Sequence, residues 1–195
     1  MAVGEAMVDD QLIDIPADVL AERERLGLDS RDEVWVGVLH MNPPPSNEHS
    51  RVQHELFLLL HGLAGPLGLD VRMELGLFDP AYAAPFNFRV PDIAVFDPAV
   101  ATVRGADGPA SLVVEVRSPG GRSFEKLPYF DAMGVGEVLI AHRDSTWVRH
   151  WVRAGDRLVE SNPADGRYRL ACVGLTIWSN GRRLSVEVDG RPTQL

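Results

Sequence analysis

The sequence LVVEVRSP, residues 112–119, decides the fold. Its first five residues are apolar except for Glu115, which is typical of a strand buried on both faces in the middle of a sheet. A sharp Ser-Pro-Gly-Gly turn follows, and residues 122–133 then predict a helix that ends at a glycine. Residues 138–142 predict the next strand. This strand–helix–strand order indicates a parallel crossover.

The rest of the chain adds helices and strands on both sides of this unit. Helices are expected at residues 16–23 and 48–64, and strands at residues 33–41, 71–78, 88–96, 168–172 and 183–188, with a hairpin over 146–160. The predicted class is α/β (α+β), with a mixed central sheet flanked by helices and a β-rich C-terminal edge. We expect an N-terminal helical segment over residues 1–30 and a single domain over residues 31–195.

Composition narrows the class of protein. The chain has 195 residues, of which 45% are hydrophobic and 24% charged, which is ordinary for a globular protein. A single cysteine, Cys172, excludes an internal disulfide framework. The longest apolar run, over residues 56–69, is short and interrupted by glycine and proline, so we expect no membrane partner and a cytoplasmic location.

The charge is unevenly distributed along the chain. The net charge of −9 argues against broad non-specific binding of nucleic acid by the whole surface. Residues 1–100 carry 6 arginines and 17 acidic residues, whereas residues 101–195 carry 13 basic and 11 acidic residues. A surface that faces phosphate is therefore expected in the second half. Lys126 is the only lysine, and lysine differs from arginine because its pKa responds to its surroundings.

Two acidic residues and this lysine suggest a metal site. Asp92 and Glu115 are 23 residues apart, which fits the ends of two neighbouring strands. Magnesium binds to one or two carboxylates together with water and phosphate oxygens, and the carbonyl of Val116 is a further candidate ligand. Lys126 would orient the attacking water or hold the phosphate, and Tyr129, on the same helix face, is expected to hydrogen-bond the site. The alternative is structural: a turn at Pro91-Asp92 and a Glu–Arg or Glu–Lys ion pair.

These residues also resemble a known family. The resemblance covers residues 33–150 and rests on an ordered set of short elements: Glu33 with Gly37, Met41-Asn42-Pro43, His49, Pro91-Asp92, Glu115-Val116, Ser118-Pro119, Lys126, Tyr129, Gly134-Val135 and Glu137. This set resembles the Uma-two family of restriction endonucleases, in the PD-(D/E)XK nuclease superfamily. The resemblance implies the restriction endonuclease-like fold and hydrolysis of DNA that depends on magnesium or manganese.

The resemblance also implies roles for individual residues. Asp92 and Glu115 would be the metal ligands and Lys126 the catalytic lysine. In the wider superfamily the lysine lies two residues after the glutamate, where this chain has Arg117. In the family pattern the lysine instead lies on the following helix, as Lys126 does. The chain departs from the pattern at Glu125, which replaces an acid often found before this lysine, and at Val38, where the family often has a second acid.

Further residues have two interpretations each. Glu74 is either a third acid of the site or part of a solvent-facing row with Arg72. His49 either contacts phosphate or a neighbouring acid, or is a surface or capping residue at the start of a helix. Together with Glu33, Arg117 and Tyr129, these residues form the predicted supporting set.

The sequence thus leads to two hypotheses. The first is a metal-dependent endonuclease that hydrolyses DNA phosphodiester bonds, and it includes a homodimer as the form that cuts two strands. The second is a catalytically inactive nuclease-fold module for binding or assembly, which the acidic first half favours.

Overall fold

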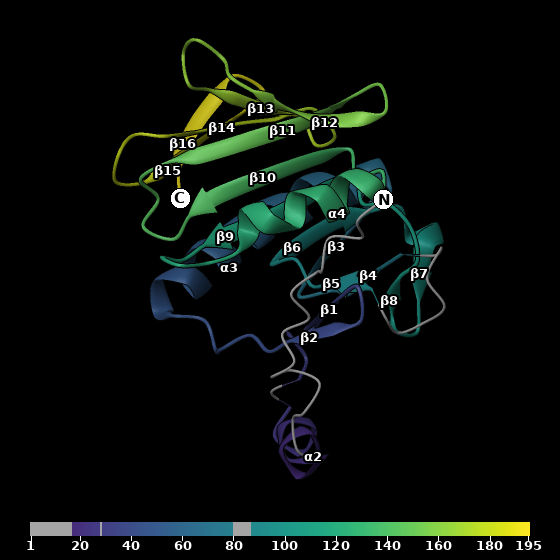
Figure 1. The fold of residues 1–195 in the computed structure, drawn as a ribbon. Helices are drawn as coiled ribbons and strands as arrows, with labels where there is room; N and C mark the ends of the chain where they lie inside the picture. The colour runs from purple at the N-terminus through teal and green to yellow at the C-terminus, as the bar shows by residue number, and fades with distance from the viewer. Residues whose placement is uncertain (1–16, 28, 80–86) are drawn as a thin grey trace, which may run out of the picture.

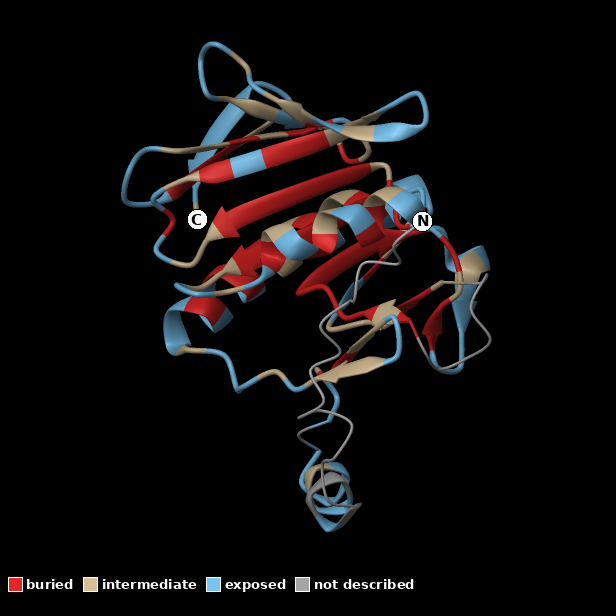
Figure 2. Cartoon of the chain, in the orientation of Figure 1, coloured by how far each residue is buried: buried red, intermediate tan, exposed pale blue. Residues whose placement is uncertain are grey.

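The computed structural model describes residues 17–27, 29–79 and 87–195, and a six-stranded mixed sheet lies at its centre (Figure 1). The strands lie in the order β12 (Arg157–Ser161), β11 (Val148–Ala154), β10 (Glu137–His142), β9 (Leu112–Arg117), β6 (Ile93–Phe96) and β3 (Asp70–Met73). β9 and β10 are parallel, and the other neighbours are antiparallel. The predicted buried central strand and its parallel crossover are confirmed, and Figure 2 shows both strands buried almost throughout.

The two faces of this sheet are covered by different elements. Helix α3 (Asn47–Ala64) packs on one face, which also carries a C-terminal sheet of β13 (Tyr168–Leu170), β14 (Leu175–Ser179), β15 (Leu184–Val188) and β16 (Arg191–Gln194). Helix α4 (Leu127–Ala132), preceded by a 3-10 turn at Ser123–Lys126, covers the other face. Leu112 and Val114 join the core beneath α3, whereas Val113 joins the core beneath α4. Because side chains alternate along a strand, Glu115 lies on the α4 side, as Lys126 does.

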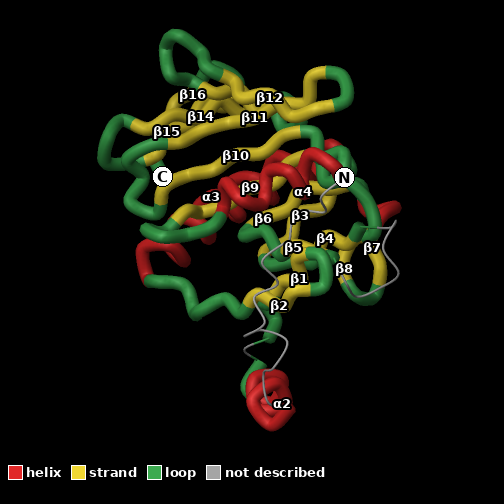
Figure 3. Tube along the Cα trace, in the orientation of Figure 1, coloured by secondary structure: helices red, strands yellow, loops and turns green. Residues whose placement is uncertain are grey.

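A second sheet of six shorter strands lies beside the central sheet, and helix α2 (Ala17–Arg25) lies beyond its β1–β2 end (Figure 3). Its strands lie in the order β2 (Val38–His40), β1 (Glu33–Trp35), β5 (Phe88–Arg89), β4 (Leu77–Phe78), β8 (Gly105–Ala106) and β7 (Ala101–Thr102). The single strand predicted over residues 33–41 is wrong, because these residues form the β1–β2 hairpin. Val36 and Gly37, at φ 51° and 87°, make its turn.

The other two long strands of the prediction are also divided. Residues 71–78 separate into β3 and β4 because Glu74 has a left-handed backbone, with φ 54°. Residues 88–96 separate into β5 and β6, with Val90, Pro91 and Asp92 between them. Proline has no N–H to offer a sheet, which accounts for the interruption. Asp92 therefore lies at the start of β6, beside the neighbouring strand β9, in which Val114 pairs with Ile93.

The helices agree more closely with the sequence. The Ser46 side chain accepts a hydrogen bond from the His49 N–H and so caps α3. Helix α2 (Ala17–Arg25) corresponds to the first predicted helix, and the helix predicted over residues 122–133 begins as the 3-10 turn. The loop predicted over residues 79–87 falls mostly outside the described residues. No helix in the described part of the chain is long and apolar enough to cross a membrane.

Candidate active site

Asp92 lies at the centre of the candidate site with both carboxylate oxygens occupied. His49 Nε2 lies 3.0 Å from its Oδ1, and the Arg31 guanidinium donates to the same oxygen at 3.1 Å. The Val116 N–H donates to Oδ2 at 2.6 Å. Burial raises the pKa of Asp92, but the contacts with His49, the charge of Lys126 and the Val116 N–H outweigh it, so the pKa lies below its ordinary value. Asp92 is therefore held as a carboxylate.

Glu115 and Lys126 meet beneath helix α4. Lys126 Nζ donates to Glu115 Oε1 at 2.9 Å, and both side chains are buried. Burial raises the pKa of Glu115 to about 8, and the carboxylates of Asp92 and Glu33 add to this rise while Lys126 opposes it. Burial is thus the main reason that Glu115 keeps its proton to a higher pH than an ordinary glutamate.

Glu33 holds Lys126 from the opposite side. Lys126 Nζ lies 2.9 Å from Glu33 Oε1, and that oxygen also accepts the Val90 N–H at 2.7 Å. The Trp35 indole donates to the other oxygen of Glu33 at 2.9 Å. Burial lowers the pKa of Lys126, but the carboxylates of Glu115, Glu33 and Asp92 outweigh it and raise the pKa above its ordinary value. Lys126 is therefore a fixed cation.

Arg31 forms ion pairs with two acidic residues, Asp92 and Glu74. Its Nε lies 3.1 Å from Glu74 Oε1, while its terminal nitrogen contacts Asp92. Gln53 Nε2 donates to the Asp92 carbonyl at 2.9 Å from helix α3. Glu74 has features of both interpretations: its side chain is 33% exposed, and its carboxylate pairs with Arg31, which also contacts Asp92. Its role as a third acid of the site stays a prediction.

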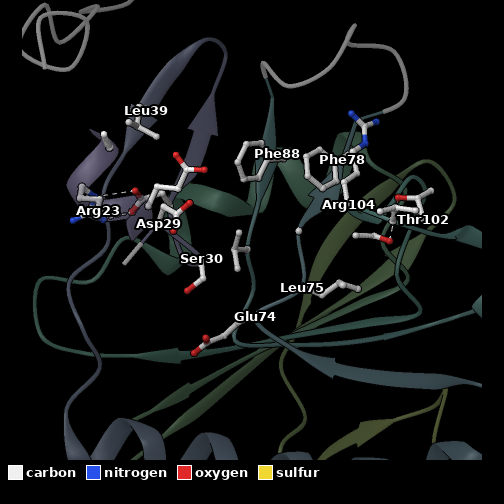
Figure 4. A pocket seen from close by; sticks show the side chains of 17 residues that line it. Arg23, Asp29, Ser30, Leu39, Glu74, Leu75, Phe78, Phe88, Thr102 and Arg104 are labelled. Atoms are coloured by element: carbon white, nitrogen blue, oxygen red, sulfur yellow. Dashed lines mark hydrogen bonds and ion pairs between the residues drawn. The ribbon is translucent and has the colours of Figure 1, made fainter. Parts of the chain in front are cut away.

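Asp92, Glu115 and Lys126 line a cavity of about 570 Å³. Its walls include Arg31, Glu33, Trp35, His40, His49, Asp92, Glu115, Ser118, Arg122, Lys126 and Arg143. A separate cavity of about 700 Å³ lies beside the β1–β2 hairpin, and Figure 4 shows Glu74 at its lower edge with Phe78 and Phe88 above. The larger cavity contains neither Asp92 nor Glu115, so we place the candidate chemistry in the smaller one.

Comparison with known proteins gives the family. A family model for Uma2, described as "Putative restriction endonuclease", matches residues 20–181. The chain belongs to the Uma2 family. Among solved structures, it is similar to a putative nuclease of DUF820 from Anabaena variabilis, with 16% sequence identity, a TM-score of 0.58, and coverage of 73% of this chain and 83% of that chain. No curated protein matches. The predicted restriction endonuclease-like fold is confirmed.

The donor set of this Uma2 chain suits a hard divalent cation. No group of three or more His, Cys, Asp or Glu side chains is arranged to hold a metal ion within the described ranges. Magnesium commonly takes only one or two carboxylates and completes its shell with water and phosphate oxygens. Glu33, Asp92 and Glu115 supply carboxyl oxygens at this cavity, and Glu74 lies at its edge through its contact with Arg31. Hard oxygen donors of this kind fit a divalent cation.

Two predicted supporting residues lie apart from the carboxylates. The Tyr129 hydroxyl donates to the Leu77 carbonyl at 2.7 Å, and the Tyr129 ring packs on the Arg89 guanidinium. The expectation that Tyr129 hydrogen-bonds the site is therefore wrong. Arg117 lies over the Phe124 ring, 5.1 Å from its centroid. It does not take the place of the lysine, in agreement with the family pattern.

The contacts of the remaining site residues agree only in part with the predictions. His49 contacts Asp92 directly, which confirms its contact with a neighbouring acid. Val116 contributes its N–H to Asp92, and the role of its carbonyl stays a prediction. Arg31 and Trp35 also belong to the site, and neither was predicted from the sequence. The Trp35 ring makes a cation–π contact with the Arg89 guanidinium, and its indole N–H donates to Glu33. No local sequence pattern indicates either contact.

Proposed function

We propose that this protein is a metal-dependent endonuclease that hydrolyses DNA phosphodiester bonds, with magnesium, or manganese in its place, bound by Asp92 and Glu115. One observation carries the proposal: two buried carboxylates and a buried lysine from separate elements meet at one cavity, in a chain of the Uma2 family. Neither a turn at Pro91 nor a simple ion pair accounts for the gathering of so many buried ionisable groups, because each is costly to bury.

In this proposal, each side chain around the metal has its own role. When bound, a divalent metal supplies an activated water and neutralises charge on the scissile phosphate. His49, Arg31 and the Val116 N–H fix the orientation of Asp92. Lys126 acts as a cation that holds the phosphate, because its raised pKa makes it a poor proton acceptor. Glu33 positions Lys126 from the side opposite Glu115.

Arginines at the cavity suit a DNA backbone. Arg122 and Arg143 line it together with Arg31, and both come from the half of the chain with a net positive charge. Phosphate contacts of this kind supply most non-specific affinity for DNA. Because the whole protein carries a net charge of −9, we expect binding to concentrate at this cavity and to weaken steeply with salt. The homodimer that would cut both strands stays a prediction.

The substitution Glu115→Gln tests this function. We expect cleavage of plasmid and linear DNA in magnesium to fall at least about a hundredfold, because an amide is a weaker metal ligand and cannot balance the cation. Circular dichroism and a thermal melt would check that the variant is folded. Glu125→Gln is the matched control, since Glu125 is exposed and pairs with Arg122 on the surface. Cleavage by Glu115→Gln at the wild-type rate would contradict the assignment.

A binding or assembly module is the second candidate. The observation that favours it is that Asp92 and Glu115 already have protein partners for their charges. Such a network can serve stability or specificity of folding without chemistry. Calorimetric titration with magnesium separates the two candidates: the module predicts no heat that depends on Asp92, whereas the nuclease predicts binding that Asp92→Asn removes.

A further inference from the structure

Arg31 makes a contact that the proposed metal ligands do not need. Its guanidinium spans two carboxylates, with Nε 3.1 Å from Glu74 Oε1 and a terminal nitrogen 3.1 Å from Asp92 Oδ1. The Asp92 side chain is 7% exposed and the Glu74 side chain 33% exposed, with Arg31 between them at 18%. The guanidinium therefore bridges a buried acid and one near the surface.

The Glu74 backbone is shaped to present its carboxylate there. A glutamate at φ 54° adopts a strained, left-handed conformation, which persists only where surrounding contacts fix it. The Glu74 N–H donates to the Asp92 carbonyl at 3.2 Å, and Gln53 holds the same carbonyl from α3. Glu74 and Asp92 are thus joined by a backbone hydrogen bond, which holds side by side the two segments that carry their carboxylates.

The Arg31 backbone is fixed as well. The Asn42 side-chain amide donates to the Arg31 carbonyl at 2.6 Å, and the next residue, Asp32, pairs with Arg23. With the main chain held, only the long side chain is free to redistribute between the two acids. A guanidinium suits this task because its planar set of donors contacts two carboxylates at once.

We propose that Arg31 takes the place of the divalent metal on Asp92 in the metal-free protein, and that metal binding transfers its guanidinium to Glu74. This inference rests on the metal-binding part of the proposed function. Arg31 and the metal then compete for the Asp92 carboxylate. Glu74 favours metal binding because it pairs with the Arg31 guanidinium once the metal has displaced it from Asp92. In the metal-free protein Arg31 lines the cavity, so its charge starts close to where a phosphate would bind.

Two substitutions have opposite expected effects. Arg31→Ala removes the competitor, so manganese measured by isothermal titration calorimetry should bind at least about tenfold more tightly, since a charge-assisted contact is lost from the metal-free state only. Glu74→Gln removes the group that holds Arg31 outside, so manganese should bind several-fold more weakly. Thermal melts give a second readout: added manganese should raise the melting temperature of Arg31→Ala more than that of the wild type.

Controls separate direct competition from a general charge effect. Arg72→Ala removes a surface cation of strand β3 that pairs with Asp70 and not with Asp92, so manganese affinity should stay within about twofold of wild type. Equal tightening in Arg72→Ala and Arg31→Ala would overturn the proposal, and so would unchanged or weaker binding in Arg31→Ala. If Asp92→Asn removes binding from the wild type, the proposed metal site stands even where the competition fails. Absence of binding in both the wild type and Arg31→Ala would overturn the metal site as well.

Discussion

Glu33 is the residue on which the position of Lys126 depends. Its two oxygens hold the lysine ammonium, the Val90 N–H and the Trp35 indole. The Trp35 ring in turn packs between the Arg89 guanidinium and Arg122, each with its central carbon 4.4 Å from the ring centroid. Lys126 is therefore fixed through a chain of contacts that begins in the core and ends at the cavity wall.

We expect Glu33→Gln to reduce cleavage about ten- to a hundredfold, because the amide cannot balance the lysine charge and the lysine moves toward Glu115. The free energy of unfolding should fall by about 1–3 kcal/mol, because buried contacts with a charged group are weakened. Steady-state cleavage and urea unfolding measure the two effects. A variant with lowered stability but wild-type cleavage would show that Glu33 serves the fold alone.

At the residue scale, the residues that could be predicted were those that are unusual for their position in the sequence. Glu115 is conspicuous in an apolar strand, and Lys126 is conspicuous as the only lysine, so both were predicted and the structure brings them together. Arg31 was missed because it lies in a polar connecting segment, where an arginine is ordinary. Its partners, Glu74 and Asp92, are 43 and 61 residues away, and no local pattern reports such contacts.

At the element scale, the β1–β2 hairpin has a strained turn. Val36 is 68% exposed and has φ 51°, a conformation that a β-branched residue rarely adopts. We expect Val36→Asn to raise the free energy of unfolding by about 1 kcal/mol, because asparagine tolerates the left-handed region. Chemical denaturation gives the measurement. Val38→Asn, in the adjoining strand, is the control and should not stabilise; a loss of stability in Val36→Asn would contradict the strain.

The division of strands was the part of the secondary structure that the sequence did not predict. Propensity favours extended backbone for a valine and gives a glutamate no tendency to turn, yet Val36 and Glu74 both interrupt strands with left-handed backbones. Tertiary contacts decide these conformations, such as the hydrogen bond from the Glu74 N–H to Asp92. Helix α3 was predictable because its capping serine and apolar spacing are both local.

At the scale of the whole molecule, Glu137 fastens the C-terminal sheet to the central sheet. His150 Nε2 lies 3.0 Å from Glu137 Oε2, and the N–H groups of Ala171 and Cys172 donate to its carboxylate at 3.1 and 2.8 Å. Burial raises the pKa of Glu137, but these contacts outweigh it and hold the pKa below its ordinary value. The carboxylate thus joins two sheets that share one core.

We expect Glu137→Gln to lower the free energy of unfolding by about 2 kcal/mol at pH 7, since contacts to a buried charge are lost. The folded pKa lies below the unfolded value, so this contribution is present above about pH 4.5 and is lost as the pH falls through the folded pKa. The difference between variant and wild type should therefore shrink at low pH. Urea unfolding across pH 3–8 measures it, and a difference that is constant with pH would exclude this role.

The overall arrangement was predictable only in its central part. The parallel pair of strands and its crossover helix follow from residues 112–142, which are neighbours in sequence as well as in space. The small sheet joins residues from 33 to 106 through strands of two or three residues. Such strands are too short to show a period of two, and their order depends on long-range packing.

The buried Lys126 makes the molecule suitable for chemical footprinting. As it is the only lysine, an amine-acylating reagent has one side chain to modify besides the α-amino group. In the folded protein that ammonium is enclosed between two carboxylates and stays protonated, so acylation requires the α4 side of the cavity to open. The rate of labelling at Lys126, read by mass spectrometry of the peptide that contains it, would therefore measure how often this cavity opens.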